Sequence, residues 1–171
     1  MTCCVTGHRP AGFPFSRDPD TELFNCYIQA LQNEIVSLID QGYIHFITGM
    51  AEGADLDFAK VIISLRNDFP DIVLEAAFPY PSRSAKERTK RQEDKDFVVK
   101  HCDLTYIVSD HYFNGCMHKR NRYIVDKADV VLAIWNGEQS GGTWSTIQYA
   151  ISKGKKIRYI MLNDLSKPHK S

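Results

Sequence analysis

Three glycine-containing segments of the sequence carry residue types that bind small anions. The first is Gly7-His8-Arg9-Pro10, where glycine lets the backbone turn sharply and arginine can hold a phosphate or carboxylate through two parallel hydrogen bonds. His8 adds a side chain that titrates near neutral pH. We interpret Gly7, His8 and Arg9 as one side of a ligand site, and the alternative is a plain turn with solvated side chains.

The second segment runs from Thr48 to Asp55 and reads Thr-Gly-Met-Ala-Glu-Gly-Ala-Asp. Small residues at a helix start expose backbone N–H groups, and the helix dipole adds positive potential, so an anion can bind there. Glu52 does not suit a bare phosphate site, and it would instead bind a ribose hydroxyl or act as a base. Asp55 is either a ligand contact or only an acid in the first helical turn. The predicted contacts are Thr48, Gly49, Ala51, Glu52, Gly53 and Asp55.

The third segment runs from Asn136 to Thr143 and contains Gly141-Gly142-Thr143. These three residues open a predicted helix and form a second candidate anion cradle, with the Thr143 hydroxyl as an extra donor. Such a sequence is a weak signal alone, because helix caps often look like this. The predicted contacts from this segment are Asn136, Gly141, Gly142 and Thr143.

A basic segment, Met117-His118-Lys119-Arg120-Asn121-Arg122, opens another predicted helix. Cations at a helix N-terminus oppose the dipole, and this mild penalty favours a functional role for Arg120, with Asn121 beside it. His111 and His118 lack partners at metal-ligand spacing, so neither a metal site nor a cofactor is predicted. The dinucleotide motif G-x-G-x-x-G and the P-loop motif G-x-x-x-x-G-K-[ST] are both absent from the sequence.

The candidate segments must be positioned by strands and helices, which the sequence indicates through short apolar runs that alternate with helical patterns. The apolar runs predict strands at Thr2–Thr6, Ile44–Thr48, Ile72–Phe78, Leu104–Val108, Val130–Trp135 and Lys156–Met161. The predicted helices cover about Phe24–Leu38, Gly53–Arg66, Ser84–His101, Lys119–Lys127 and Thr143–Ser152. The helix at Ser84–His101 carries mixed charges, which we interpret as a solvated face.

This order of elements predicts an α/β fold, a Rossmann-like, open, mainly parallel sheet of about six strands with helices on both faces. The continuous apolar runs favour strands that are buried on both faces. Ligands of such sheets bind beyond the carboxyl ends of the strands, where the candidate segments begin. A single domain is predicted over residues 1–163, with a polar C-terminal tail over 164–171.

Composition disfavours several classes of protein. The chain has 171 residues, and its 21 basic and 21 acidic residues leave no net charge, which disfavours but does not exclude nucleic acid as a partner. The longest apolar run, Val130–Trp135, is far shorter than the ~18 residues of a membrane span, so no membrane partner is predicted. The five cysteines include no C-x-x-C pair: Cys3 and Cys4 are neighbours and the other three are scattered, which indicates reduced thiols and a cytoplasmic location.

The segment Val5-Thr6-Gly7-His8-Arg9-Pro10 resembles the opening of the YpsA-like family, a bacterial branch of the SLOG superfamily, and the resemblance covers about residues 1–163. It implies a Rossmann-like fold and the binding of nucleotides or nucleotide-derived ligands. YpsA-like proteins have been linked to cell division, and dimers are common in the superfamily. The resemblance therefore allows a homodimer and a protein partner.

Two further segments are similar to other SLOG branches. Thr48–Asp55 followed by Ala59 is similar to the S-G-x-A-x-G-[IA]-D-x-x-A segment of the DprA/SMF proteins, which bind single-stranded DNA. Met117–Asn121 with Gly141-Gly142 is similar to the LOG phosphoribohydrolases, whose signature is M-H-x-R-K followed by P-G-G-x-G-T-x-x-E. Arg120 matches the arginine of that signature, whereas its lysine is Asn121 here.

The glutamate of the LOG signature is Gln148 in this chain. An amide cannot accept a proton, so the resemblance implies either binding without cleavage or another carboxylate, Glu52 or Glu138, in its place. The candidate catalytic residues are Glu52 and Arg120.

The leading hypothesis is a binding or sensing module for a nucleotide or nucleotide-derived ligand, linked to bacterial cell division or stress and without enzymatic activity. The phosphate would lie on Gly141-Gly142-Thr143 with Arg120 opposite, and Gly7, Arg9 and the loop 49–53 would close the other side. The alternatives are a LOG-like hydrolase that cleaves the N-glycosidic bond of nucleoside 5′-monophosphates, and a DprA-like binder of single-stranded DNA.

Overall fold

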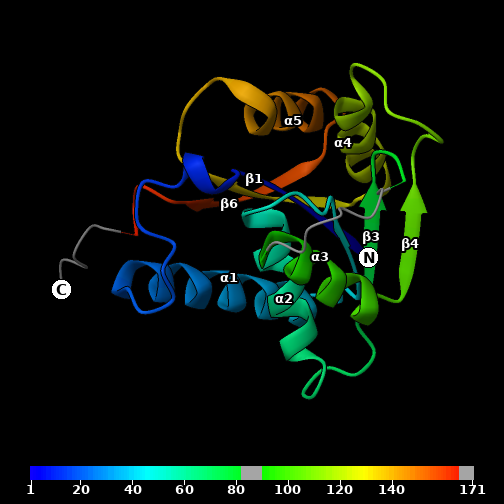
Figure 1. Ribbon diagram of the computed structural model, residues 1–171. Coiled ribbons are helices and arrows are strands. Elements are labelled where there is room, and N and C mark those ends of the chain that lie inside the picture. Colours follow the sequence, from blue (N-terminus) through cyan, green and yellow to red (C-terminus); the bar gives the residue numbers. More distant parts are fainter. Residues whose placement is uncertain (82–89, 166–171) are drawn as a thin grey trace.

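Strands and helices alternate along residues 1–81 and 90–165, which are the residues that the computed structural model describes (Figure 1). The elements are β1 (Thr2–Gly7), the 3-10 helix η1 (Pro10–Gly12), α1 (Glu22–Asp40), β2 (His45–Thr48), α2 (Ala54–Leu65), β3 (Val73–Phe78), α3 (Lys90–His101), β4 (Leu104–Ile107), α4 (Cys116–Lys127), β5 (Val130–Trp135), α5 (Gly141–Ser152) and β6 (Lys156–Met161). Each predicted strand is confirmed to within one residue at either end. The predicted helix start at Ser84 lies outside the described residues.

The six strands form one sheet in the order β4-β3-β2-β1-β5-β6. Every neighbouring pair is parallel, with Cys3 of β1 opposite Phe46 of β2 on one side and Val130 of β5 on the other. The predicted Rossmann-like fold is therefore confirmed. The order of the strands reverses at β1, because the chain runs outward to β4 and then returns through α4 to β5. In open α/β sheets, ligands bind at the carboxyl edge near such a reversal.

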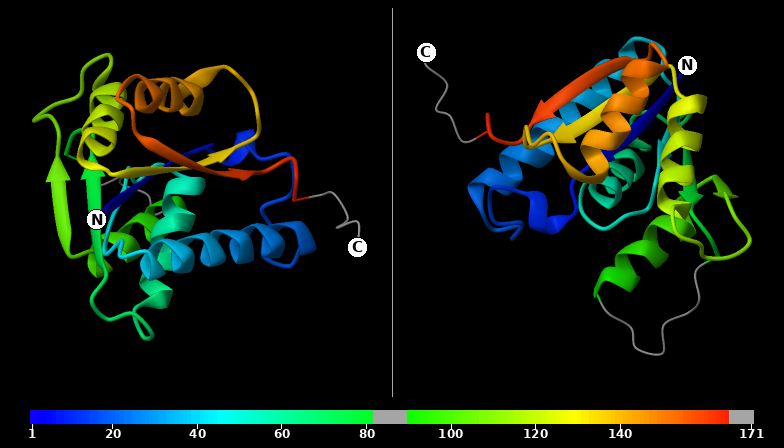
Figure 2. Two further views of the ribbon diagram at one scale, coloured as in Figure 1. Left: turned by 180° about the vertical axis from the view of Figure 1, so that it is seen from behind. Right: turned by 90° about the horizontal axis from the view of Figure 1, so that it is seen from above.

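Helices cover both faces of the sheet, with α1, α2 and α3 on one face and α4 and α5 on the other (Figures 1 and 2). The larger core lies under α1–α3, where Tyr27, Leu31, Ile35 and Leu38 of α1 are fully buried. Their spacing of three and four residues is the periodicity that predicts this helix. A smaller core lies under α4 and α5, and its members include Ile47, Ile124, Val131 and Ala150.

Strand β4 differs from the expectation that the apolar runs are buried on both faces. All four of its residues are exposed, and Leu104, Tyr106 and Ile107 keep 44–49% of their surface accessible. The expectation is wrong here because β4 is the edge strand and has a neighbour on one side only. An apolar run predicts a strand but does not reveal its place in the sheet.

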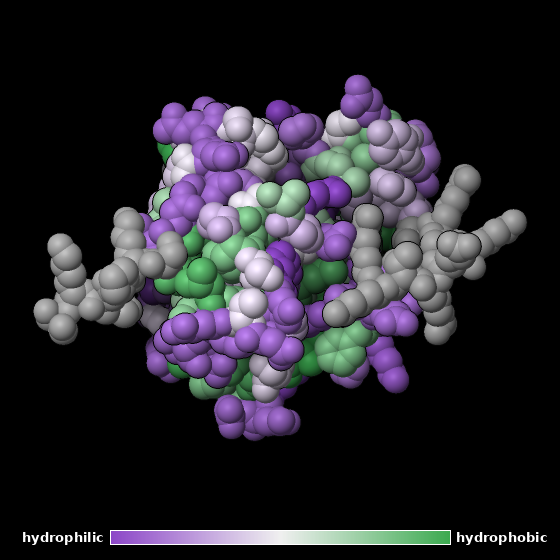
Figure 3. Space-filling model, turned by 60° about the vertical axis from the view of Figure 1, so that its left-hand side comes forward, coloured by the Kyte–Doolittle hydropathy of each residue, from purple (hydrophilic) through white to green (hydrophobic). Residues whose placement is uncertain are grey.

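The outer surface is mixed in polarity. On the face shown in Figure 3, hydrophobic residues form separate patches among hydrophilic residues, which predominate at the top and bottom of the view. Within residues 1–81 and 90–165, no helix is both long and apolar enough to cross a membrane. Leu165 still packs against the larger core, and residues 166–171 of the predicted tail lie outside the described residues.

Candidate functional site

A cavity of about 490 Å³ lies beyond the carboxyl ends of β2, β3 and β4. Its volume falls within the roughly 300–1,000 Å³ of typical small-molecule sites. Helix α3 and the first turns of α4 form the other walls. Five of the predicted site residues line the cavity, namely Arg9, Gly49, Ala51, Glu52 and Arg120.

Arg120 is the most deeply buried cation of the cavity, with 5% of its surface exposed. Its Nε donates a hydrogen bond to Oδ1 of Asn121 at 2.8 Å. Burial lowers the pKa of Arg120, while the negative charge of Asp55 partly offsets this effect. Among the residues that the structure describes, Nη1 and Nη2 of Arg120 have no hydrogen-bond or ion-pair partner. Buried charges are normally paired, so this guanidinium keeps donors for an anion in the cavity.

Gly49 lies directly beneath this guanidinium. A Cβ atom at Gly49 would lie 2.4 Å from Nη1 of Arg120 and 2.8 Å from Oδ2 of Asp55. The close approach of Arg120 and Asp55 therefore requires glycine at this position. The predicted loop glycine is thus needed for packing against a cation, rather than only for exposing backbone N–H groups.

Asp55 is 7% exposed and does not line the cavity. Its Oδ2 accepts a hydrogen bond from the backbone N–H of Ala51 at 3.1 Å, and Thr48 Oγ1 donates to the Asp55 carbonyl at 2.8 Å. Burial raises the pKa of the Asp55 carboxyl, and the positive charge of Arg120 opposes that rise. In this arrangement Asp55 is a buried counter-charge behind Arg120, and Thr48 fixes the loop that carries Gly49.

The loop after β1 packs tightly against the start of α2. The backbone N–H of Ala54 donates to the carbonyl of His8 at 3.1 Å, and a Cβ at Gly7 would lie 2.4 Å from Cβ of Ala54. Gly53 has a φ of +96°, and a Cβ there would lie 2.5 Å from the His8 carbonyl oxygen. The N–H groups of Ala51 and Ala54 thus bind protein atoms, so only part of the predicted anion cradle at α2 is free for a ligand.

His8 and Asn136 lie side by side at this junction, outside the lining of the cavity. His8 is half-buried, and burial lowers the pKa of its imidazole. Asn136 is 9% exposed, donates to the Gly12 carbonyl at 3.1 Å and accepts from the Glu138 N–H at 2.9 Å. These bonds hold the loops after β1 and β5 together at the point where the strand order reverses.

The predicted cradle at the start of α5 is open to solvent. Gly141 and Gly142 are exposed, and a Cβ at either would meet no atom within 4 Å. The N-cap residue Ser140 makes no side-chain capping bond. Gly141, Gly142 and Thr143 do not line the Arg120 cavity. The structure therefore separates them from the cavity that the other predicted loops surround.

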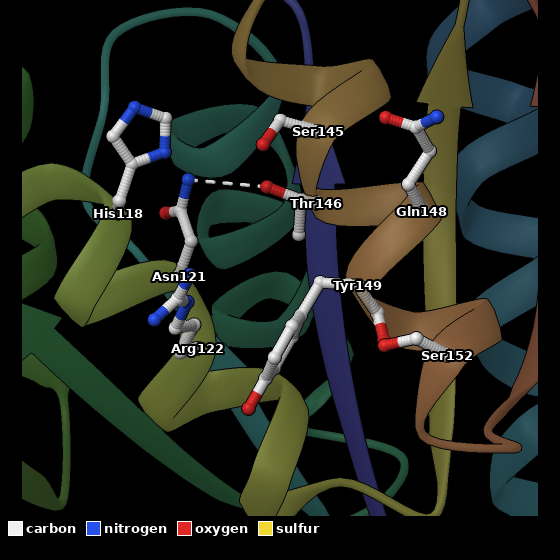
Figure 4. A pocket seen from close by; sticks show the side chains of 8 residues that line it. All are labelled: His118, Asn121, Arg122, Ser145, Thr146, Gln148, Tyr149 and Ser152. Atoms are coloured by element: carbon white, nitrogen blue, oxygen red, sulfur yellow. Dashed lines mark hydrogen bonds between the residues drawn. The ribbon is translucent and has the colours of Figure 1, made fainter.

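A polar groove of about 260 Å³ runs between α4 and α5 (Figure 4). Asn121 donates to Thr146 Oγ1 at 3.1 Å across this groove, and Thr146 Oγ1 donates to the Gly142 carbonyl at 2.9 Å. Gln148 lines the groove and not the Arg120 cavity. Glu138 is exposed and lines neither of them, whereas Glu52 lines the cavity.

Several cavity residues were not predicted from the sequence. Phe78 ends β3, Tyr80 follows it, and both form part of the apolar wall. Tyr80 meets Tyr112 edge-on at 5.4 Å between ring centroids. Helix α3 contributes Gln92, Lys95, Asp96 and Val99 to the lining, a role that the interpretation of its charges as a solvated face did not include. A helix of mixed charge gives no sequence signal for a cavity wall. Arg83, Lys86, Glu87 and Arg88 lie outside the described residues.

Comparison with known proteins gives a consistent set of matches. The profile of the YspA SLOG family matches residues 3–165. A UPF0398 protein of Bacillus licheniformis is 27% identical over 157 residues, which cover 90% of this chain and 82% of the relative. UPF0398 proteins of Bacillus cereus and Bacillus thuringiensis are each 23% identical over 167 residues, or 94% of this chain and 90% of the relative. The names of these relatives state no ligand or reaction.

Proposed function

The chain belongs to the YspA SLOG family, and from that premise we propose that it binds a nucleotide or a nucleotide-derived small molecule in the Arg120 cavity. The observation that carries the proposal is the Arg120 guanidinium, which is 5% exposed and has donors directed at no described protein group. A phosphate is the group that a planar, always-charged guanidinium binds best, through paired hydrogen bonds. Arg9 lines the same cavity and adds a second cation.

The remainder of the cavity supports a nucleotide rather than a bare phosphate. Phe78, Tyr80, Ile107 and Met117 form an apolar and aromatic wall on which a base can stack. Glu52 also lines the cavity, and a carboxylate is a group that binds ribose hydroxyl groups. The cavity thus combines cations for phosphate, an acid for ribose and an apolar surface for a base.

A thermal unfolding experiment with a ligand panel tests the proposal. The panel contains AMP, the other nucleoside monophosphates, ADP-ribose, NAD and a short DNA strand. A ligand at ~100 times its dissociation constant adds about 2.7 kcal/mol of stability, which raises the Tm of a domain of this size by roughly 5–10 °C. We expect such a shift for one nucleotide class, whereas no shift with any small ligand would refute the proposal.

Two arginine variants locate the binding site on α4. Arg120→Gln should abolish the thermal shift, because it removes the buried guanidinium of the cavity. Arg122→Gln is the matched control, since Arg122 is exposed, lies two residues further along the same helix and does not line the cavity. Circular dichroism checks that both variants are folded. Equal shifts in the two variants would contradict the placement of the phosphate beside Arg120.

A hydrolase that releases the base from a nucleotide is the second candidate, and it is favoured by the presence of Glu52 in the same cavity. A carboxylate there could act as general acid or base, a role worth roughly 10²–10⁴-fold in rate. The test is the appearance of free base during incubation with nucleoside monophosphates. Loss of that activity in Glu52→Gln would support the hydrolase, and turnover equal to buffer alone would exclude it.

A further inference from the structure

Glu75 is a buried acid that the proposed site does not use. It lies within β3, between Ile47 of β2 and Leu104 of β4 in the register of the sheet. Only 2% of its surface is exposed, and it is not among the residues that line the Arg120 cavity. Carboxylates are almost never buried to this extent unless they are paired. The groups that pair with Glu75 therefore show what it does in the fold.

Side chains of β2 and α4 hold the Glu75 carboxylate. The Tyr123 hydroxyl donates to Oε1 of Glu75 at 2.6 Å, and Nζ of Lys127 lies 3.7 Å from the same oxygen. Nε2 of His45 lies 2.9 Å from the other oxygen, Oε2. The Tyr123 ring also stacks on Tyr106 of β4, with 4.1 Å between the ring centroids and 6° between the planes. The stacking and the hydrogen bond together fix the direction of the Tyr123 side chain.

The Tyr123 hydroxyl lies on the same face of α4 as Arg120. Arg120, Tyr123 and Lys127 are spaced i, i+3 and i+7, which places them along one side of the helix. Arg120 interacts with the buried charge of Asp55, while Tyr123 and Lys127 contact Glu75. Burial and the hydrogen bond to Glu75 raise the pKa of Tyr123, so its hydroxyl keeps the proton that it donates. One face of α4 is thus attached to the fold through two buried acids.

Stability alone does not explain a buried charge in this position. Replacing a buried ion pair by apolar side chains is often neutral or stabilising, because removing charges from water is costly. The apolar residues of α4, among them Ile124 and Val125, pack against the smaller core, but such contacts have no preferred direction. A hydrogen bond weakens when its donor leaves the line to the acceptor. The bond from Tyr123 to Glu75 therefore restrains the rotation of α4 in a way that the apolar contacts cannot.

The rotation of α4 decides whether the Arg120 guanidinium faces the cavity. Successive residues of a helix are about 100° apart, so even part of such a turn would move the guanidinium away from Gly49. We propose that Glu75 is a positioning residue, which sets the rotation of α4 through Tyr123 and thereby holds Arg120 in the cavity. Only the expected effect on nucleotide affinity rests on the proposed function.

Substitutions of Glu75 and Tyr123 test the proposal by calorimetry with the panel nucleotide that gives the largest thermal shift. Glu75→Leu removes the carboxylate, and Tyr123→Phe removes the hydroxyl but keeps the ring. Each should raise Kd by roughly tenfold or more, the effect of one lost charge-assisted hydrogen bond. Glu75→Gln keeps an oxygen that accepts from Tyr123, so its Kd should stay within about twofold of the wild type. Circular dichroism establishes that each variant is folded.

A nuclear Overhauser contact between the α protons of Gly49 and the side-chain protons of Arg120 tests the positioning without a ligand. We expect it in the wild type, because a Cβ at Gly49 would lie 2.4 Å from Nη1 of Arg120. The contact should be lost in Glu75→Leu and Tyr123→Phe and retained in Glu75→Gln. If the wild type shows the contact but binds no panel nucleotide, the proposed function is refuted, and the contact in the variants still decides the role of Glu75.

The matched control is Tyr149→Phe, which removes a hydroxyl that donates to Oδ1 of Asp126 on the exposed side of α4 at 2.9 Å. It should change neither Kd nor the contact with Gly49. The proposal is overturned if the folded Glu75→Leu and Tyr123→Phe variants keep both properties, or if the control loses them equally. A loss in Glu75→Gln as large as that in Glu75→Leu would also overturn it, because the hydrogen bond from Tyr123 would then not be the cause.

Discussion

Substitution of Gly49 by alanine tests whether Arg120 is the anion-binding group. The new Cβ would lie 2.4 Å from Nη1 of Arg120, whereas ordinary contacts begin at 3.4 Å, so the guanidinium must retreat by about 1 Å. Charge-assisted hydrogen bonds need donor–acceptor distances near 2.7–2.9 Å, so a ligand anion would lose at least one of them. Such a bond contributes about 1.5–3 kcal/mol, which corresponds to roughly 10–150-fold in Kd.

The assay is isothermal titration calorimetry with the panel nucleotide that gives the largest thermal shift. Gly142→Ala is the matched control, because a Cβ at Gly142 meets no atom within 4 Å and should leave Kd unchanged. Circular dichroism checks that both variants are folded. A folded Gly49→Ala variant whose Kd stays within about twofold of the wild type would refute the role given to Arg120.

Three further substitutions have outcomes that follow from the structure. Gly142→Asp adds an acid to the open first turn of α5 and should raise the free energy of unfolding in urea by about 0.3–1 kcal/mol. The nucleotide affinity should not change if the phosphate binds beside Arg120. A large loss of nucleotide affinity would instead place the phosphate at the start of α5. The pKa of His8 is lowered from 6.5 by burial, so its contribution to stability is present above that pH and lost as pH falls through the lower value. His8→Gln should therefore flatten the fall in unfolding free energy below about pH 6.5, and an unchanged slope would contradict this. Tyr27→Phe removes the hydrogen bond of 3.1 Å from the buried hydroxyl to Oδ2 of Asp57. It should lower the free energy of unfolding in urea by about 1.5–3 kcal/mol. A negligible change would show that Arg17 alone satisfies the Asp57 carboxylate.

Local patterns along the chain predict the order of elements well. The apolar run Val130–Trp135 has the length of a strand, and the structure places β5 there with the same limits. The helix α1 follows from the spacing of Leu31, Ile35 and Leu38. These local signals succeed because α1 buries one face against the sheet, which gives a periodic pattern, and β5 is buried on both faces, which gives a continuous apolar run. It could not show that Leu104 and Tyr106 lie at an edge, because that depends on the pairing of distant strands.

The candidate site could be predicted only in part for the same reason. The sequence places Gly49 and Glu52 after a strand, and in a parallel sheet all strand ends reach the same edge. It could not distinguish Arg120, which turns into the cavity, from Arg122, which is exposed two residues later. Nor could it show that Asp55 lies behind Arg120 as a counter-charge. Both outcomes depend on how α4 is rotated against the loop after β2.

The central position of β1 has a consequence for the synthesis of the chain. Strand β1 is synthesised before β2 and β5, between which it lies. Strand β2 can pair with one edge of β1 early, but the other edge stays unpaired until β5 is made, whose Val130 lies opposite Cys3. At typical translation rates of about 5–20 residues per second, that interval is on the order of ten seconds. During this time Cys3, Cys4 and Val5, all fully buried in the finished protein, belong to a strand with an open edge. Strand β1, which lies inside the finished sheet, is thus the part of the nascent chain most exposed to mispairing until β5 pairs with its open edge.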